Sequence, residues 1–365
     1  MKHTLALSAL ALATSALMGC SSNSPTSTTT SFSAVESYNI QCTTRIEPQP
    51  SEMSVSGLTL VGTSIADAPF GTSAAEIVSY DTCTDKLYVV NAQGKKVDVL
   101  SLSESGEPSA QGQIDLTSAA TQSGVAIGAA NSVSAHQGLV AVAIESENKQ
   151  EPGIIALYRS DSLELITTYP AGALPDMVSF SKDGQYIAAA NEGEPNADYS
   201  IDPEGSVTLI DLKSGPLDAI VTQIDFREFN EGNARHDELS SDVRISHPNA
   251  TVAQDLEPEY LTFDDNGQLF VALQENNALA SIDVSAKRVT GIYGLGGKSW
   301  QDAKLDASNK DKMVGNLQSY PMLEGYTCLT ASPATRLTDR LISSPQMKAT
   351  VESMALIPHN KNAMS

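Results

Sequence analysis

Carboxylates are concentrated in one loop of the chain, between two apolar segments with the pattern of strands. The loop lies between residues 186–190 and residues 206–210, and no Lys or Arg occurs between Lys182 and Lys213. Its acidic residues are Glu192, Glu194, Asp198, Asp202 and Glu204. Carboxylates that have no basic partner nearby in the sequence must either be solvated or hold a cation. The loop is therefore the first candidate for metal or ligand binding.

The start of the chain has the pattern of a bacterial export signal. Lys2 and His3 provide a basic start, and residues 5–18 form an apolar run too short to span a bilayer. Cys20 then follows Leu-Met-Gly, a sequence that resembles the lipobox, in which the cysteine is lipidated. An ordinary cleaved signal with a coincidental cysteine is the alternative. We expect residues 1–20 to be a lipoprotein signal peptide with lipidation at Cys20.

The segment that follows the signal is rich in Ser and Thr. Residues 21–36 offer little apolar surface to bury, so we expect them to form a flexible tether. Ser21, rather than Asp, follows the cysteine, which is compatible with delivery to an outer membrane. We therefore expect a chain held in the cell envelope by its N-terminal lipid, facing the periplasm or the cell surface. Its other partner would be a protein or a small molecule.

Three cysteines remain after Cys20, and export to an oxidising compartment favours disulfide formation. Pairing of Cys42 with Cys83 would fasten the start of the folded region to its first repeat. The alternative is two buried thiols. Cys328 would then have no partner, which is unusual in an exported protein.

The formal net charge of −22 limits the ligands that the chain can bind. No basic stripe is available to neutralise phosphates, so the sequence argues against nucleic acid and against anionic lipid surfaces. The glycines at 294–297 lack the following Lys-Ser/Thr of a phosphate loop, and we expect no nucleotide cofactor. No zinc motif or serine-nucleophile motif occurs. We expect His236 and His247, beside a polar loop, to be solvated.

Four segments of the chain share one pattern, in which an apolar strand is followed by a turn and a second apolar strand. Two of the turns, at residues 183–184 and 266–267, contain Asp-Gly or Asn-Gly, which is typical of hairpins. A third and a fourth strand follow each time, giving units of roughly 45 residues. The first two strands lie at 75–80 and 87–91, 131–136 and 138–143, 175–180 and 183–190, and 258–263 and 266–273.

Repeated four-stranded antiparallel units of this length are typical of β-propeller blades. The second strands are apolar almost throughout, as at residues 187–190 and 269–273, which fits sheets buried between neighbouring blades. A β-sandwich or a β-solenoid is the alternative. We expect an all-β fold over residues 37–326, a β-propeller that is incomplete, with about four blades present.

Two columns of the repeat alignment are polar. Glu76, Ser132, Asp176 and Glu259 open the first strands of successive units. Glu145, Glu192 and Glu275 follow the second strands. First strands line the central channel of a propeller, where carboxylates at one level repel one another by several kcal/mol unless a cation or protons intervene.

Carboxylate oxygens are the ligands that Ca²⁺ prefers, so a divalent-cation site, with Ca²⁺ as the first choice, is one hypothesis for these columns. The candidate ligands are Asp176, Glu192, Glu194, Asp202, Glu204, Glu257 and Glu259. The alternative is that these side chains cap strand ends and accept hydrogen bonds from backbone amides.

Five motifs of the chain are long and specific. They are Leu-Pro-Asp-Met at 174–177, Asn-Glu-Gly-Glu-Pro at 191–195, Asp-Pro-Glu-Gly-Ser at 202–206, Ala-Gln-Asp-Leu-Glu-Pro-Glu-Tyr at 253–260 and Ala-Leu-Gln-Glu-Asn-Asn-Ala at 272–278. They resemble a known family, the choice-of-anchor I propeller domain of bacterial surface proteins, over roughly residues 55–326. The resemblance implies a propeller with a surface anchor. Some long relatives are labelled alkaline phosphatase-like and others mesenchyme-specific cell-surface glycoprotein-like, so its implication for activity is weaker.

The sequence changes character after Tyr326. Residues 327–365 contain no repeat, and their codons can be read in the neighbouring frame as a sequence similar to residues 174–194 of this chain. We expect a frameshift after Tyr326, so that residues 327–365 are a non-native tail and the later blades are missing.

Two functions are compatible with these sequence features. The first is a lipid-anchored envelope propeller that acts as a binding or structural module without catalysis, and we favour it because no catalytic constellation is evident. The second is a metal-dependent phosphoester hydrolase, in which the carboxylates hold metal ions that activate water. The basic residues that could then hold phosphate are Arg227, Arg244 and Lys298.

Overall fold

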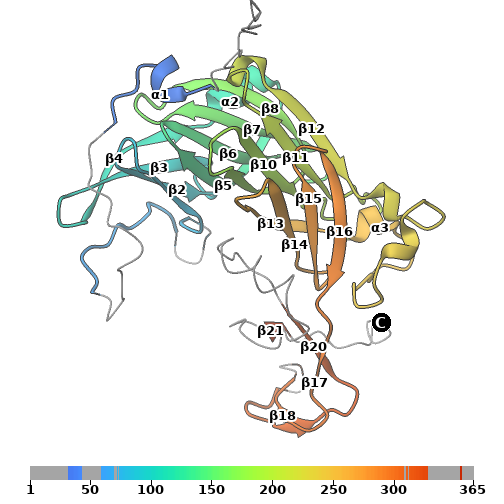
Figure 1. The fold of residues 1–365 in the computed structure, drawn as a ribbon. Helices are drawn as coiled ribbons and strands as arrows, with labels where there is room; N and C mark the ends of the chain where they lie inside the picture. Colours follow the sequence, from blue (N-terminus) through green and yellow to red (C-terminus); the bar gives the residue numbers. More distant parts are fainter. Residues whose placement is uncertain are drawn as a thin grey trace, which may run out of the picture. The chain divides into compact units, whose positions relative to one another are not determined.

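The computed structural model describes residues 32–42, 59–69, 72, 74–307, 310, 312–327 and 354–355, and the statements below concern these residues (Figure 1). They belong to one compact unit, Ser31–Ser365. The predicted signal peptide, Cys20 and Cys328 lie outside the described residues, as does most of the predicted tail. No described helix is long and apolar enough to cross a membrane.

Four antiparallel four-stranded sheets follow one another along the chain, and we call them blades 1 to 4. Blade 1 contains β1 (Val78–Asp81), β2 (Lys86–Asn91), β3 (Lys96–Leu102) and β4 (Pro108–Asp115). Blade 2 contains β5 (Ile127–His136), β6 (Leu139–Ser146), β7 (Pro152–Arg159) and β8 (Leu165–Ala173). Blade 3 contains β9 (Pro175–Phe180), β10 (Tyr186–Asn191), β11 (Ser206–Asp211) and β12 (Ile220–Asp225). Blade 4 contains β13 (Pro258–Phe263), β14 (Gln268–Leu273), β15 (Ala278–Asp283) and β16 (Arg288–Gly294).

The remaining elements are short. The helical turns are α1 (Ala34–Ser37), α2 (Thr117–Ser123), η2 (Pro216–Asp218), η3 (Arg227–Phe229), η4 (His236–Glu238) and α3 (Val252–Asp255). After blade 4 come β17 (Lys298–Ser299), β18 (Lys304–Leu305), β19 (Gln318–Ser319), β20 (Glu324–Thr327) and β21 (Met354–Ala355), which form small pairings of their own.

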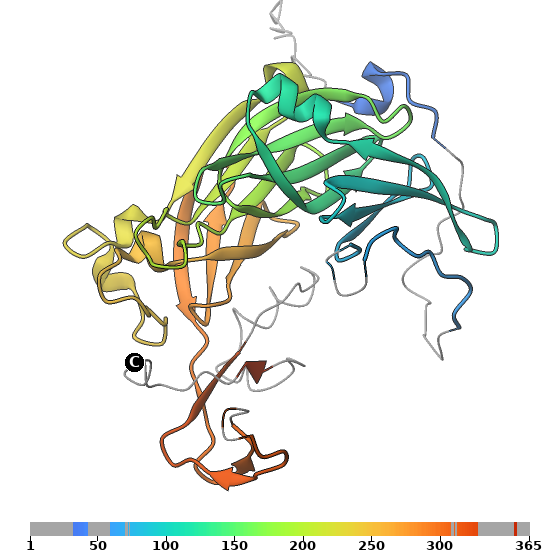
Figure 2. The ribbon, with the colours of Figure 1, turned by 180° about the vertical axis from the view of Figure 1, so that it is seen from behind.

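Each blade is a meander, with its strands hydrogen-bonded in the order of the chain. The first strands are neighbours in space: β1 contacts β5, β5 contacts β9, and β9 contacts β13. Figures 1 and 2 show the four sheets side by side in chain order. The predicted propeller architecture is confirmed, because four four-stranded meanders follow one another with their first strands in contact, as the inner strands of propeller blades are.

Apolar residues fill the spaces between neighbouring blades. One cluster joins blades 1 and 2, a second joins blades 2 and 3, and a third joins blades 3 and 4. All eight residues of β6 are buried, because its side chains meet another blade on both faces. The continuous apolar runs in the sequence thus correspond to strands enclosed between two blades.

The segment 32–42 crosses three blades at the end of the propeller that holds the β1–β2 and β5–β6 turns. Phe32 lies beside Gly215 of blade 3, and Ile40 packs on Gly138 of blade 2. Cys42 and Cys83 form the disulfide bond that the sequence predicts, with their sulfur atoms 2.05 Å apart. The predicted tether, residues 21–36, therefore overlaps the folded region. Ser33 caps α1 and Ala34 is buried, so packing begins before residue 36.

Candidate ligand site at the blade axis

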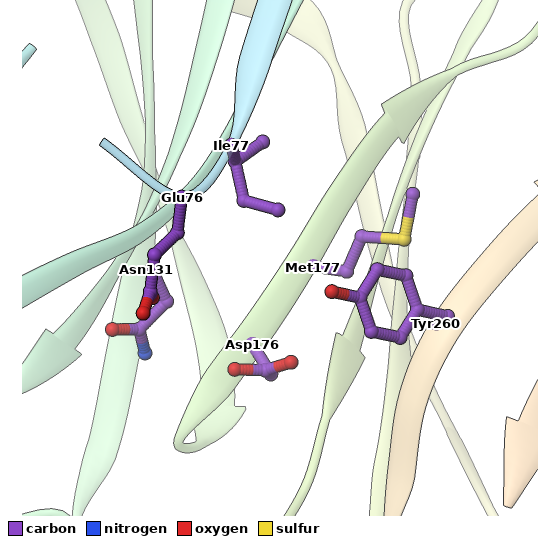
Figure 3. A pocket seen from close by; sticks show the side chains of 6 residues that line it. All are labelled: Glu76, Ile77, Asn131, Asp176, Met177 and Tyr260. Carbon is purple, nitrogen blue, oxygen red and sulfur yellow. The ribbon is translucent and has the colours of Figure 1, made fainter. Parts of the chain in front are cut away.

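The first strands of three blades are irregular where they begin. In β9, Pro175 is paired with Asn191 and Met177 with Ala190, which leaves Asp176 as an extra residue. A β-bulge of this kind turns a side chain out of the regular alternation of a strand. Asp176 is thereby directed towards the axis instead of into a blade interface, as Figure 3 shows.

The same irregularity occurs in blades 2 and 4. In β5, the pairs of Ala130 with Ile144 and of Ser132 with Ala143 leave Asn131 as the extra residue. In β13, the pairing shifts between Pro258 and Leu261, so the bulge contains Glu259 and Tyr260. The predicted column is therefore wrong at one position: Ser132 is buried in the sheet, and Asn131 takes its place at the axis.

A pocket of about 280 Å³ lies where these strands meet. It is lined by Glu76, Ile77, Asn131, Asp176, Met177 and Tyr260, which come from all four blades. In Figure 3, Glu76 lies next to Asn131, and the Tyr260 hydroxyl points towards Asp176 and Glu76. The lining thus places two carboxylates, one amide and one phenol around a single opening.

The loop after β10 brings a further carboxylate beside Asp176. The Glu192 amide donates to the Leu174 carbonyl oxygen at 2.9 Å, which fixes Glu192 next to the crossover into β9. Gly193 has a φ of 70°. A Cβ there would lie 2.9 Å from the Glu204 carbonyl, so the loop can fold back on itself only with glycine at this position.

Glu257 reaches the same end of the propeller from the segment before β13. Its amide donates to the Asn276 side-chain oxygen at 3.1 Å. Asn276 is fully buried, and its side-chain nitrogen donates to the Asp255 and Arg244 carbonyl oxygens. The motif around Asn276 therefore serves to position Glu257 near Glu194, Glu259 and Glu275, whose charges act on it.

These carboxylates hold their protons unusually tightly. Burial, and then the charges of Asp176 and Glu257, raise the pKa of Glu192 to about 8. Burial, and then the charge of Glu275, raise the pKa of Glu257 to about 8. Loss of solvent disfavours the charged form of an acid, and neighbouring negative charges add to this effect. Near neutral pH the two side chains are therefore largely protonated.

The pKa values of the two carboxylates in the β-bulges, Asp176 and Glu259, are raised for the same reasons. Burial, and then the charge of Glu76, raise the pKa of Asp176 to about 6, while Lys149 opposes the shift. Burial, and then the charge of Asp176, raise the pKa of Glu259 to about 7. Burial also raises the pKa of Tyr260, whose neighbours include Asp176 and Glu259. The group thus behaves as one coupled set of acids.

Basic residues are sparse at this rim. The Lys149 amine lies 3.9 Å from Glu145, and Arg244 lies 4.0 Å from Glu275. Glu145 also accepts a hydrogen bond of 3.3 Å from Asn131, which ties it to the pocket. Glu145, which belongs to the second polar column of the sequence, thus lies next to the residues of the first column.

The structure separates two of the predicted ligands from the others. Glu204 pairs with Arg227 at 2.6 Å, on the insertion that follows β12. Burial raises the pKa of Asp202, and the charge that opposes this shift is that of His247. The structure thus gathers Asp176, Glu192, Glu194, Glu257 and Glu259 at the axis, and it gives Asp202 and Glu204 other neighbours.

Of the gathered carboxylates, Asp176 lines the pocket, and Glu192, Glu257 and Glu259 act on one another beside it. Within the described ranges, no three His, Cys, Asp or Glu side chains are grouped closely enough to hold a metal ion directly. The side chains as placed therefore do not fit a bare divalent ion. The pocket volume exceeds the roughly 30 Å³ that one water occupies, so there is room for several waters.

The two histidines expected to be solvated are partly buried instead. The His236 ring bonds to the Phe229 carbonyl oxygen at 2.9 Å. The His247 ring stacks on Tyr199, with ring centres 4.4 Å apart. Both lie in or against the insertion between β12 and β13, whose packing cannot be inferred from its polar composition.

Two residues of the pocket were missed by sequence reasoning. The repeat alignment assumes regular alternation along each strand, so it puts Ser132 rather than Asn131 in the first polar column. Tyr260 was counted only as a strand residue. For Tyr260 the available signal is its position next to Glu259 at the opening of a first strand, whereas Asn131 stands between Ala130 and Ser132 and has no such signal.

Several solved structures resemble the chain at low sequence identity. The Dos1 propeller is 12% identical with a TM-score of 0.42, over 70% of this chain and 54% of that one. A protein of unknown function from Bacteroides caccae is 11% identical with a TM-score of 0.33, over 60% and 61%. Hydrazine synthase of Kuenenia stuttgartiensis is 12% identical with a TM-score of 0.29, over 58% and 65%. The chain thus spans less than two thirds of each of these structures.

No curated protein matches the chain. A family model does: the choice-of-anchor I domain matches residues 76–328, which include all four blades and begin at Glu76 of the axis pocket. The resemblance seen in the motifs is thereby confirmed. The chain belongs to the choice-of-anchor I domain family and is a surface-associated β-propeller module.

Proposed function

We propose that the protein is a binding module of the cell surface whose axis pocket takes a positively charged ligand. The observation that carries the proposal is a set of four carboxylates that act on one another, Asp176, Glu192, Glu257 and Glu259, with pKa values raised to about 6, 8, 8 and 7. Asp176 lines the axis pocket together with Glu76. Gathering partly buried acids costs folding free energy, and a bound cation would offset that cost.

Ca²⁺ remains the cation that the proposal names, because carboxylate and amide oxygens are its usual ligands. Asp176 and Glu76 line the pocket, and no three possible ligands converge among the described residues, so the ion would be held largely through its own waters. Asn131 and Tyr260 would then serve as neutral polar contacts to those waters. This arrangement predicts weak binding, of the kind seen in extracellular calcium modules.

We also propose how the propeller is attached to the membrane and that its later blades are missing. Lipidation at Cys20 would hold the module at the outer membrane, facing the periplasm or the cell surface. The family match ends at residue 328, close to the proposed break in the reading frame after Tyr326, which supports a propeller whose later blades are missing. Sequencing the coding DNA around codon 327 tests this part independently of any binding assay.

A phosphoester hydrolase is less well supported. Of the basic residues that could hold phosphate, Arg227 is paired with Glu204, and Lys298 lies over the Trp300 ring at 4.1 Å. Arg244 donates to the main-chain oxygen of Glu275, at the rim of the acidic group. A phosphate ester would therefore enter a pocket that repels it.

The deciding experiment measures thermal unfolding of the full chain with and without Ca²⁺, together with turnover of a chromogenic phosphate ester. We expect millimolar Ca²⁺ to raise the midpoint, because a ligand of the folded state stabilises it by RT ln(1 + [L]/Kd). Glu192→Gln should remove the shift, and Glu204→Gln, in the same loop but paired with Arg227, should retain it. An unchanged midpoint would refute the cation proposal, and turnover abolished by a chelator would favour the hydrolase.

A further inference from the structure

A second pocket lies away from the axis, beside the fourth strand of blade 4. Its volume is about 410 Å³, which is within the usual range for small-ligand sites. Residues 290–294 of β16 line one side, and Glu238 and Ser240 of the insertion between β12 and β13 line the other. The two pockets have no lining residue in common, so a ligand here would be independent of the cation proposed above.

The strand β16 is irregular where it borders this second pocket. Its pairing with β15 shifts between Ser281 and Ile282, which leaves Thr290 as an extra residue in a β-bulge. Bulges are over-represented next to functional sites. At the end of the strand, a Cβ on Gly294 would lie 2.5 Å from the main-chain carbonyl carbon of Asp242. The insertion can therefore close against the strand only because residue 294 is glycine.

A largely buried guanidinium joins the two sides of the second pocket. Arg235 donates to the Val289 and Thr290 carbonyl oxygens at 2.6 and 3.0 Å. It also donates twice to Oε2 of Glu238, at 2.9 and 2.7 Å. Both of these bonds go to one carboxylate oxygen, so Oε1 of Glu238 is left to accept from a ligand. Since Glu238 is the single charged residue of the described lining and is paired, the pocket suits an uncharged ligand.

Tyr293 adds an aromatic surface to these polar groups. The end of its ring lies over Gly291, where a Cβ would be 2.7 Å from the hydroxyl oxygen and 2.9 Å from the ring carbon that bears it. The ring can therefore lie along β16 only because residue 291 is glycine. Tyr293 is 55% exposed, so much of its ring is open to a ligand in the pocket.

We propose that this second pocket binds a neutral sugar. The C–H groups of a sugar ring form an apolar face that can lie on an aromatic ring, while its hydroxyls need donors and acceptors around them. Tyr293 would supply the aromatic platform, Oε1 of Glu238 an acceptor, and the Ser240 hydroxyl a donor. An anionic ligand would be repelled by Glu238, and a cationic ligand would compete with Arg235 for it.

The test is saturation-transfer difference NMR on the full chain, in a zwitterionic detergent without a sugar head group. The probes are glucose, galactose, mannose and N-acetylglucosamine, each titrated to obtain its Kd. We expect at least one of them to bind in the millimolar range, with saturation received by its ring C–H protons. Tyr293→Ala should weaken this binding by at least about tenfold, because the platform is lost. Tyr199→Ala, which removes another half-exposed tyrosine from a different loop, should bind like wild type.

A second variant keeps the tyrosine but moves it. Gly291→Ala should also weaken sugar binding, because the added methyl group would meet the Tyr293 hydroxyl. Equal far-ultraviolet circular dichroism of all variants would show that they fold. No transfer to any of the sugars up to about 50 mM, or equal affinity in wild type and Tyr293→Ala, would overturn the inference. A chelator should leave sugar binding unchanged, and loss of binding in chelator would overturn the inference by assigning the sugar to the axis site.

Discussion

The side-chain nitrogen of Asn131 donates a hydrogen bond of 3.2 Å to the main-chain oxygen of Pro175, the residue before Asp176. The bulge of blade 2 is thereby joined to the bulge of blade 3. The same nitrogen also lies 3.3 Å from a Glu145 oxygen. A neutral amide thus holds together two parts of an otherwise acidic rim.

Replacement of this amide should loosen the pocket. We expect Asn131→Ala to lower the free energy of unfolding by about 1–3 kcal/mol, because buried polar groups would lose their partner. Chemical denaturation measures the change. Asn249→Ala, at an exposed residue of the insertion, is the control and should change stability by less than about 0.5 kcal/mol. Equal effects of the two variants would show that the link between bulges contributes little.

Stability should fall as pH rises through neutrality. The folded-state pKa values of Glu192 and Glu257, about 8, lie above the ordinary value of 4.5. The folded chain therefore binds protons more tightly than the unfolded chain. The stability that this contributes is complete below about pH 4.5 and is lost as pH approaches 8.

Glu192→Gln isolates that contribution. One pKa unit corresponds to about 1.4 kcal/mol, so we expect the substitution to stabilise the chain at pH 9 by about 1–3 kcal/mol. At pH 5 the two proteins should differ little. Denaturation at the two pH values measures both quantities. Destabilisation by Glu192→Gln at pH 9 would mean that the carboxylate is stabilised in the folded state, contrary to the raised pKa.

Glu204 should behave as an ordinary surface residue. Its partner Arg227 is well exposed, and exposed ion pairs contribute roughly 0–1 kcal/mol. We expect Glu204→Gln to lower the free energy of unfolding by about 0–1 kcal/mol at pH 9, where Glu192→Gln should raise it. Stabilisation by Glu204→Gln at that pH would place Glu204 with the axis carboxylates, against the observed pairing.

Reduction of the disulfide should release the N-terminal segment. The bond between Cys42 and Cys83 closes a long loop, and such bonds contribute about 2–4 kcal/mol. We expect the Cys42→Ser, Cys83→Ser double variant to unfold at lower denaturant and to be cleaved by protease near Ile40. Identical cleavage of wild type and variant would show that packing on Gly138 alone holds the segment.

The architecture was predictable because its signals are local and repeated. The Asp183–Gly184 turn marks a hairpin, and the apolar second strands indicate burial on both faces. Each such signal recurs in several blades, so an error in one would be corrected by the others.

The details of the site were less predictable, because they depend on single backbone irregularities. A β-bulge has no clear sequence pattern, and the one in β5 exchanged Ser132 for Asn131 at the axis. The pairing of Glu204 with Arg227 depends on how the insertion after β12 folds, which polar composition does not specify. Glu192 and Glu257 are buried near each other only because loops from two blades meet, and the sequence pattern of a single blade does not show this.

Calorimetric titration of Ca²⁺ into the full chain measures directly whether the acidic group binds a cation. We expect saturable binding to the wild-type chain at pH 7.5, weakened at least tenfold in Glu257→Gln and unchanged in Glu204→Gln. Absence of binding up to about 10 mM, beyond the 10⁻⁴–10⁻³ M range of extracellular modules, would contradict it. So would equal binding in wild type and Glu257→Gln.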